Sequence, residues 1–258
     1  MNKPSVSIVT VCFNSEATIR DTVRSVMNQT HPVEYIVVDG ASQDGTVDVV
    51  RELLSQSTLN YQIISERDKG MYDAMRKGIA ASHGDVVAIL NADDRFESND
   101  SVEKVASAFA QDIDVVIGDV IITDQDFGKV LRYYSASAFR PEDLTRGIMP
   151  PHAGFYARRD LFEKLGSYMP DYRYAGDFEL ILRFLLKARV KYRYLPEILI
   201  RMRPGGLSNR SLRHRFNLTK EVLRALKENG YPSSWLLVLS KIPGKLFQYF
   251  RRPPGQAR

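Results

Sequence analysis

The chain has 258 residues, of which 44% are hydrophobic and 26% are charged, so it is long enough and apolar enough to bury the core of one large domain. Its single cysteine, Cys12, excludes an internal disulfide and lies in an apolar run, which predicts a buried structural thiol. No apolar run reaches the roughly 18 residues that a membrane-spanning helix needs, and the first run is too short for a signal peptide.

The net charge of +5 is unevenly distributed along the chain. Residues 201–258 carry 13 Lys and Arg against 2 Asp and Glu, whereas residues 1–200 carry 23 against 29. An acidic body and a basic tail indicate two surfaces with different partners. We therefore expect a folded domain over residues 1–208 and a basic helical extension over residues 209–258.

The first half of the chain alternates apolar runs with amphipathic segments. Strands are expected at residues 5–13, 35–39, 61–65 and 86–90, and helices at residues 16–27, from residue 46, at residues 71–82 and at residues 98–110. This alternation is typical of right-handed crossovers, so we predict an α/β fold with a mostly parallel sheet and flanking helices.

The second half of the chain predicts a less regular order of elements. Strands are expected at residues 114–118, 120–123, 129–134, 154–157, 191–195 and 197–202. Helices are expected at residues 158–165, 177–188, 212–229 and 233–250, the last interrupted by Pro243 and Gly244, and residues 141–147 are expected to form a short helix or a loop. Two adjacent glycines, at positions 205 and 206, predict a flexible joint before the extension, and residues 251–258 are expected to be disordered.

A buried strand at residues 86–90 leads directly into Asn91, Asp93 and Asp94. Ligands of open α/β sheets bind beyond the carboxyl ends of the strands, so this acidic pair is placed where it would meet a ligand. A plain polar turn is the alternative, because Asn and Asp favour turns. Other acids follow strand ends in the same way and are expected along the same edge: Asp39, Asp44, Glu66 and Asp68.

The first strand-to-helix turn, residues 10–15, contains neither Gly-x-Gly-x-x-Gly nor Gly-x-x-x-x-Gly-Lys-Ser/Thr. Dinucleotide enzymes and P-loop enzymes need such glycines to bring backbone amides close to phosphate. The sequence therefore argues against both classes. A nucleotide could still bind here without those glycines if a metal ion, rather than a helix terminus, neutralises its diphosphate.

Four ordered segments together resemble the motifs of glycosyltransferase family 2. They are residues 7–14 (Ser-Ile-Val-Thr-Val-Cys-Phe-Asn), 37–46 (Val-Val-Asp-Gly-Ala-Ser-Gln-Asp-Gly-Thr), 66–75 (Glu-Arg-Asp-Lys-Gly-Met-Tyr-Asp-Ala-Met) and 90–94 (Leu-Asn-Ala-Asp-Asp). The resemblance extends from residue 5 to about residue 208. It implies a GT-A fold, with a nucleotide-binding half at residues 1–118 and an acceptor half at residues 119–208, and an inverting, metal-dependent enzyme that uses a nucleotide sugar.

The resemblance also assigns the nucleotide site. Asp39 would accept a hydrogen bond from the base, the uracil imide N–H, while Thr10 and Asn14 would line the pocket for base and ribose. The loop at Asp68 and Lys69 would close over the nucleotide. Turn or helix capping is the alternative for the first three residues, and a plain exposed loop for the last two.

The same resemblance places a divalent cation beside Asn91, Asp93 and Asp94. Asp94 would bind Mg²⁺ or Mn²⁺ bridging the diphosphate, and Asp93 would hold the ribose or share the metal. A cation is expected on physical grounds, because negative charge accumulates on the leaving diphosphate. Mg²⁺ commonly uses only one or two carboxylates besides phosphate oxygens.

Asp177 opens a predicted helix and matches the position of the family's general base, although an Asp there is also an ordinary N-cap. Glu179 is the alternative carboxylate. The family often has two adjacent acids at this point, whereas this chain has Gly176 before Asp177. His152 resembles a histidine on the acceptor side, and Arg203 or Arg201 is expected to reach the diphosphate.

These expectations combine into a UDP-sugar-dependent glycosyltransferase that extends a glycan or polyprenyl-linked acceptor in cell-surface polysaccharide synthesis. The aromatic, aliphatic and basic tail suits an anionic membrane surface, which predicts a cytoplasmic protein at the inner face of the membrane. Packing on the body or in a dimer is the alternative for the tail, and nucleic-acid binding is not expected. The rival functions are a non-catalytic nucleotide-binding or assembly subunit with the same fold and a nucleotidyltransferase.

Overall fold

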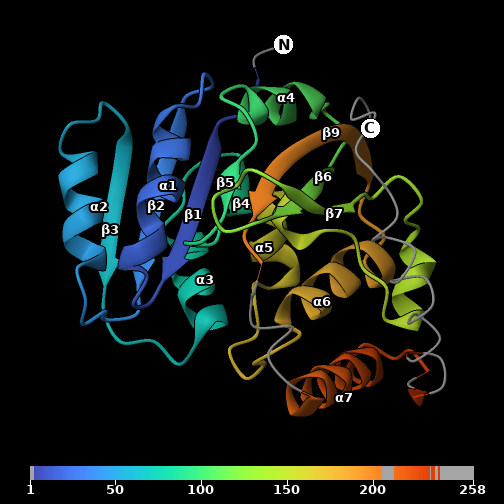
Figure 1. Ribbon diagram of the computed structural model, residues 1–258. Coiled ribbons are helices and arrows are strands. Elements are labelled where there is room, and N and C mark those ends of the chain that lie inside the picture. Colours follow the sequence, from blue (N-terminus) through green and yellow to red (C-terminus); the bar gives the residue numbers. More distant parts are fainter. Residues whose placement is uncertain (1–2, 205–211, 233, 236–237, 239–258) are drawn as a thin grey trace.

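A computed structural model describes residues 3–204, 212–232, 234–235 and 238 (Figure 1). The described residues form one nine-stranded sheet in the order β3-β2-β1-β4-β8-β6-β9-β5, with β7 paired to β6. Helices cover both faces of this sheet, so the predicted α/β class is confirmed.

The first part of the sheet is parallel. Strand β1 lies between β2 and β4, and β2 pairs with β3 at the edge; the bounds are β1 Val6–Cys12, β2 Val33–Asp39, β3 Asn60–Ser65 and β4 Val86–Ile89. The crossovers between them are α1 Glu16–Met27, α2 Thr46–Leu54 and α3 Met71–Ala80. All seven of these elements were predicted from the sequence pattern.

The second part of the sheet is mixed rather than parallel. Strand β8 pairs antiparallel with both β4 and β6, and β6 pairs parallel with β9. The strands are β5 Arg95–Phe96, β6 Val115–Thr123, β7 Val130–Tyr134, β8 Phe155–Arg158 and β9 Tyr192–Met202. The helices are α4 Ser101–Ala108, η1 Pro141–Arg146, η2 His152–Gly154, α5 Arg159–Leu165, α6 Gly176–Ile181, the π-helix η3 Leu182–Lys187 and α7 Leu212–Glu228.

Alternation along β1 feeds two separate hydrophobic cores. Val6 and Ile8 pack with the apolar faces of α1, α2 and α4, whereas Val9 and Val11 pack with α3, α5, α6 and α7 on the other face. Successive residues of a strand point to opposite faces, and a sheet covered on both faces therefore has apolar residues at every position. Cys12 is buried at 6% exposure and free, which confirms the prediction of a structural thiol.

The structure differs from the sequence-based expectation where strands are short or interrupted. The expected break at Gly118 is absent, because β6 runs unbroken from Val115 to Thr123 with a register shift against β9 at that point. The two strands expected around Pro196 are one strand, β9. Among the described helices, none is long and apolar enough to cross a membrane.

The predicted joint at residues 205–206, most of the helix predicted at 233–250 and the tail at 251–258 lie outside the described residues. The boundary predicted between residues 208 and 209 lies there too, and it stays a prediction. Helix α7 packs against α6 on the side of the molecule away from α4 (Figure 1).

Candidate active site

The carboxyl ends of β1, β2 and β4 meet at one edge of the sheet (Figure 1). Strand β2 ends at Asp39, and the turn after β4 holds Asn91, Asp93 and Asp94. The predicted nucleotide and metal residues therefore follow neighbouring parallel strands at the edge where α/β sheets bind ligands.

Asp39 is fully buried at the end of β2. One carboxylate oxygen accepts hydrogen bonds from the Ser42 amide at 3.0 Å and the Ser65 hydroxyl at 2.7 Å, and the other accepts from the Ser42 hydroxyl. Burial together with the negative charge of Asp39 raises the pKa of the neighbouring Cys12 thiol. Both oxygens of Asp39 already have donors within the chain, so an N–H of a bound base would have to share an oxygen with a serine.

Asn14 and Thr10 lie in different environments, although both were predicted to line the nucleotide pocket. Asn14 is exposed in a left-handed conformation with φ of 48°, and its side-chain oxygen accepts a hydrogen bond from the Gln43 amide at 2.9 Å. Thr10 has no exposed surface, and its hydroxyl accepts a hydrogen bond from Tyr35 at 3.1 Å. The expectation for Thr10 is therefore corrected, because this side chain supports β1 from within the core.

The loop of Asp68 and Lys69 lies beside the end of β2. The Asp68 carboxylate accepts a hydrogen bond from the Gly70 amide at 2.8 Å, and a Cβ on Gly40 would come within 2.6 Å of its other oxygen. The Lys69 side chain is exposed and makes no ion pair within the described residues. The loop thus presents one unpaired cation next to the turn that follows Asp39.

The turn after β4 holds one carboxylate below the surface and one at it. Asp94 is 1% exposed and accepts a hydrogen bond from the Asn91 side-chain amide at 3.0 Å, whereas Asp93 is partly exposed. Burial is the main cause that raises the pKa of Asp94 well above its usual value, and the charge of Asp93 adds to it. Two carboxylates and an amide oxygen provide the hard oxygen donors that Mg²⁺ and Mn²⁺ accept.

The residues around this turn fit a cation held jointly by protein and substrate. In the part of the chain that the structure describes, no group of three His, Cys, Asp or Glu side chains is arranged to hold a metal ion by itself. An incomplete set is what a site completed by phosphate oxygens requires, and the burial of Asp94 beside another acid is a cost that a divalent cation would offset. Asp93 and Asp94 would be the protein ligands.

Arg203 lies against this turn, but its guanidinium already binds other groups of the protein. It donates to the backbone oxygens of Asp93 at 3.3 Å and Gln125 at 2.8 Å, pairs with Asp21, and lies 4.0 Å from the centre of the Phe127 ring. In this conformation Arg203 holds the backbone of the acidic turn. Arg201, the other candidate for the diphosphate, is paired with Glu97 instead.

Asp177 is the second residue of α6, and its carboxylate meets side chains from two other elements. Tyr72 of α3 donates its phenol hydrogen bond to one carboxylate oxygen. The Nδ1 atom of His152, in η2, lies 3.6 Å from the other oxygen. The side chains of Asp177 and His152 are 19% and 33% exposed, so both are open to a ligand. Asp177 and His152 were both predicted for the site, and the structure brings them together although they are 25 positions apart in the sequence.

Asp177 does not cap its helix, which removes the main structural alternative for it. The residue at the N-cap is Ala175, and Glu221 of α7 accepts hydrogen bonds from the backbone amides of Arg173, Tyr174 and Ala175 at 2.7–3.1 Å. A carboxylate 44 residues beyond Asp177 thus binds the backbone just ahead of α6. No local sequence signal identifies Glu221, because the contact depends on how α7 packs.

Glu179 does not belong to the site, and the expectation for it is corrected. Its side chain is fully buried, and its two oxygens accept hydrogen bonds from the Arg183 guanidinium at 2.9 and 2.8 Å. Two residues along a helix correspond to a rotation of about 200°, so Glu179 and Asp177 face nearly opposite directions. The ion pair of Glu179 and Arg183 is a feature of the core.

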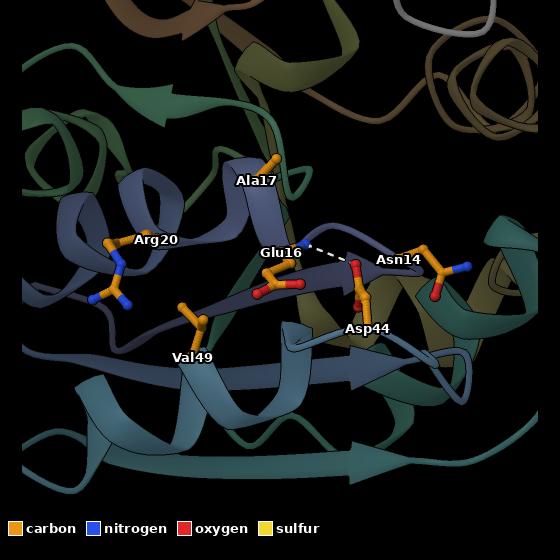
Figure 2. A pocket seen from close by; sticks show the side chains of 6 residues that line it. All are labelled: Asn14, Glu16, Ala17, Arg20, Asp44 and Val49. Carbon is orange, nitrogen blue, oxygen red and sulfur yellow. Dashed lines mark hydrogen bonds between the residues drawn. The ribbon is translucent and has the colours of Figure 1, made fainter.

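A shallow, open hollow of about 530 Å³ adjoins the nucleotide side of the site, between the starts of α1 and α2 (Figure 2). It is lined by Asn14, Glu16, Ala17, Arg20, Asp44 and Val49. Figure 2 shows the Glu16 amide donating to the Asp44 carboxylate at 3.1 Å. Of the residues predicted to bind nucleotide, metal or acceptor, only Asn14 lines this hollow. The hollow therefore lies beside the candidate site and not within it.

Comparison with known proteins assigns this geometry to a family. The profile of "Glycosyl transferase family 2" matches residues 7–173. The chain is 29% identical over 213 residues to a "PGL/p-HBAD biosynthesis glycosyltransferase" of Mycobacterium bovis, which covers 81% of both chains. It is 36% identical over 103 residues, 40% of both chains, to the "putative teichuronic acid biosynthesis glycosyltransferase TuaG" of Bacillus subtilis.

Two solved structures share the fold. Residues 1–349 of TarS from S. aureus, solved with UDP-GlcNAc, superpose with a TM-score of 0.69 at 14% identity, covering 89% of this chain and 68% of that one. The mannosyltransferase PcManGT from Pyrobaculum calidifontis, solved with GDP-Man and Mn²⁺, superposes with a TM-score of 0.64 at 18% identity, covering 88% of this chain and 64% of that one. The family profile, the GT-A-type sheet and the acids at its carboxyl edge agree, and the chain belongs to glycosyltransferase family 2.

Proposed function

We propose that this glycosyltransferase is an inverting, divalent-metal-dependent enzyme that moves a sugar from a UDP-sugar to a glycan or lipid-linked acceptor in cell-surface polysaccharide synthesis. The observation that carries this proposal is that the carboxylates form two separate groups. Asp93 and Asp94 form an acidic pair at the end of β4, and Asp177 is a separate, accessible carboxylate held by Tyr72 and His152.

One accessible carboxylate on the acceptor side supports a single displacement. A sugar hydroxyl is a poor nucleophile until its proton is removed, and Asp177 is placed to accept that proton. The new bond to the anomeric carbon forms as the bond to the nucleoside diphosphate breaks, which inverts the configuration. A double displacement would need a second carboxylate as nucleophile, and Glu179, the other acid of α6, is locked in its buried ion pair.

The donor side needs a group that offsets charge on the leaving diphosphate. A divalent cation at Asp93 and Asp94 would supply that electrostatic stabilisation. The burial of Asp94 beside Asp93 supports this assignment, and PcManGT was solved with Mn²⁺ and a nucleotide sugar. Asn91 fixes the orientation of Asp94, and Lys69 is an unpaired cation within the loop beside Asp39.

Release of UDP from a panel of UDP-sugars tests this function. The purified full chain is incubated with each donor and a glycan or lipid-linked acceptor, with and without EDTA. We expect turnover that EDTA abolishes and added Mg²⁺ or Mn²⁺ restores, and a loss of about 10²-fold or more in Asp94→Asn. Turnover that persists in EDTA, or an Asp94→Asn variant as active as the parent, would rule out the proposed donor chemistry.

We also propose that the enzyme works at the inner face of a cell membrane and binds anionic lipid through α7. The helix exposes Arg213, Arg215 and Lys220 next to Phe216, which is 50% exposed and stacks on Trp235 with ring centres 5.5 Å apart. Exposed aromatic rings among unpaired cations are typical of a helix that lies on an anionic lipid surface. Vesicle binding tests this part of the proposal.

A further inference from the structure

Tyr72 is a buried aromatic residue whose only polar atom is directed at the proposed base. Its side chain is 2% exposed, and its ring stacks on Tyr168 with ring centres 5.6 Å apart and planes 15° apart. The phenol hydroxyl donates to the Asp177 carboxylate across 105 positions of sequence. Because the ring is clamped, the hydroxyl has a fixed place from which to hold the carboxylate.

Gly176 makes room for this ring. A Cβ at position 176 would come within 2.8 Å of three ring carbons of Tyr72, closer than atoms approach without displacement. The residue just before Asp177 is therefore small because the Tyr72 ring lies on its backbone.

Groups from three elements and from the segment before α6 surround the Asp177 carboxylate. Tyr72 of α3 donates to it, and His152 of η2 lies 3.6 Å away. Tyr134 of β7 and Tyr168, which precedes α6, lie near it: burial is the main cause that raises the pKa of both phenols, and the charge of Asp177 adds to it. For Tyr134, burial is the main cause that raises the pKa to about 12, and its hydroxyl donates to the Met149 backbone oxygen instead. The Tyr168 hydroxyl has no hydrogen-bond partner within the described residues. Tyr72 is thus the one of these three tyrosines whose hydroxyl donates to Asp177.

We propose that Tyr72 is a positioning residue of the transfer reaction: its hydroxyl fixes one oxygen of Asp177 and leaves the other free to receive the acceptor's proton beside His152. This inference rests on the proposed function of Asp177 as base. The ring, the glycine beneath it and the hydroxyl form one unit that holds the carboxylate in place.

Tyr72 keeps the proton that this contact needs. Burial raises the pKa of Tyr72 well above 10, and the charge of Asp177 and their hydrogen bond raise it further. The phenol therefore stays neutral at the working pH of the enzyme and can donate to the carboxylate.

Tyr72→Phe tests the proposal, because it keeps the ring, the stack and the contact with Gly176 and removes only the hydroxyl. At the pH optimum kcat should fall by roughly tenfold because the carboxylate is less well placed. The KM for the donor should change by less than about twofold, since the defect lies on the acceptor side.

Tyr168→Phe is the matched control, because it removes a hydroxyl from the same stack without touching Asp177. Its kcat should be that of the parent. In an Asp177→Asn background, Tyr72→Phe should cause no further loss, since both substitutions act on one interaction. An unchanged kcat in Tyr72→Phe, an equal fall in Tyr168→Phe, or additive losses in the double variant would overturn the proposal.

A readout that does not require turnover separates this inference from the proposed function. The carboxyl signal of Asp177 is recorded by ¹³C NMR, and it is identified by its absence in Asp177→Asn. We expect its chemical shift to change in Tyr72→Phe, because the hydrogen bond from the phenol is lost, and to stay at the parent value in Tyr168→Phe. A protein that shows this change but transfers no sugar would contradict the proposed function and confirm the contact; an unchanged chemical shift would refute the inference itself.

Discussion

At the scale of single residues, Asp94 combines features that a purely structural residue would lack. It is buried beside another acid, and one oxygen accepts a hydrogen bond from Asn91. Burial of a charged group without a full set of partners is unfavourable. A residue retained at such a cost is expected to act on a ligand.

The cost at Asp94 leads to a stability prediction that is independent of turnover. The folded protein raises the pKa of Asp94, so the unfolded state ionises more readily and the folded state loses stability as pH rises above the unfolded value near 3.9. At neutral pH, Asp94→Asn should therefore stabilise the metal-free protein by roughly 0.5–2 kcal/mol. Mg²⁺ or Mn²⁺ should raise the Tm of the parent more than that of the variant. Thermal unfolding with EDTA and with each cation measures both effects, and an Asp94→Asn protein less stable than the parent would contradict them.

The roles of individual residues were only partly predictable from the sequence. The acidic turn after β4 was recognisable because it follows an apolar strand, where ligands bind. Asp177 was recognisable only from the resemblance, because it opens a predicted helix at the position of the family's base. The side-chain directions of Thr10 and Glu179 were not, because a motif gives a position on the chain but not the face of the strand or helix that carries it. Both residues point into the core.

At the scale of elements, the regular strand–helix crossovers could be predicted from the sequence, whereas the short and bulged strands could not. Strands β1 to β4 and helices α1 to α3 have apolar runs and stripes long enough to show their period. Strand β5 has only two residues, too few for any pattern, and it forms because β9 offers a free edge. Gly118 and Pro196 looked like breaks, yet bulged pairing between β6 and β9 accommodates both.

The start of α6 depends on a distant element, which gives a second stability prediction. Glu221→Ala removes the acceptor for three backbone amides ahead of α6, and it should lower the free energy of unfolding by about 1–3 kcal/mol. It should also lower kcat, because Asp177 sits in the first turn of that helix. Urea unfolding and the UDP-release assay measure the two effects.

Glu163→Ala is the control for this substitution. Glu163 is 66% exposed and pairs only with Arg159 one helical turn away, so its removal should cost less than about 0.5 kcal/mol. If the two variants unfold at the same urea concentration, the contact between α7 and the start of α6 does not support the site.

At the scale of the whole molecule, the acidic body and the basic end found in the sequence meet at α7. Glu221 accepts hydrogen bonds from the backbone at the start of α6, and Glu228 accepts hydrogen bonds from Arg224 and Tyr172. The acids of the helix are thus engaged within the protein. Its remaining cations, Arg213, Arg215, Lys220 and Lys227, make no ion pair within the described residues. One helix therefore supports the proposed base from its inner face and presents positive charge from its outer face.

This outer face predicts how the full chain binds vesicles. Phe216→Ser combined with Lys220→Gln removes an exposed ring and the cation that lies 4.6 Å from its centre. Binding to vesicles of phosphatidylglycerol and phosphatidylcholine, measured by flotation, should weaken by about tenfold, since each cation near an anionic surface contributes about 1 kcal/mol and the ring adds buried apolar area. Higher salt should weaken the binding of the parent as well.

The control replaces one exposed apolar residue and one exposed cation away from α7. Leu131→Ser with Lys191→Gln also removes one exposed apolar side chain, 43% exposed, and one exposed cation, and it should bind as the parent does. Both double variants should release UDP from the UDP-sugar donor at the parental rate when the acceptor is soluble, because neither touches the carboxylates. If the two variants bind vesicles equally weakly, binding depends on net charge alone. If the α7 variant binds as the parent does, α7 does not contact the lipid.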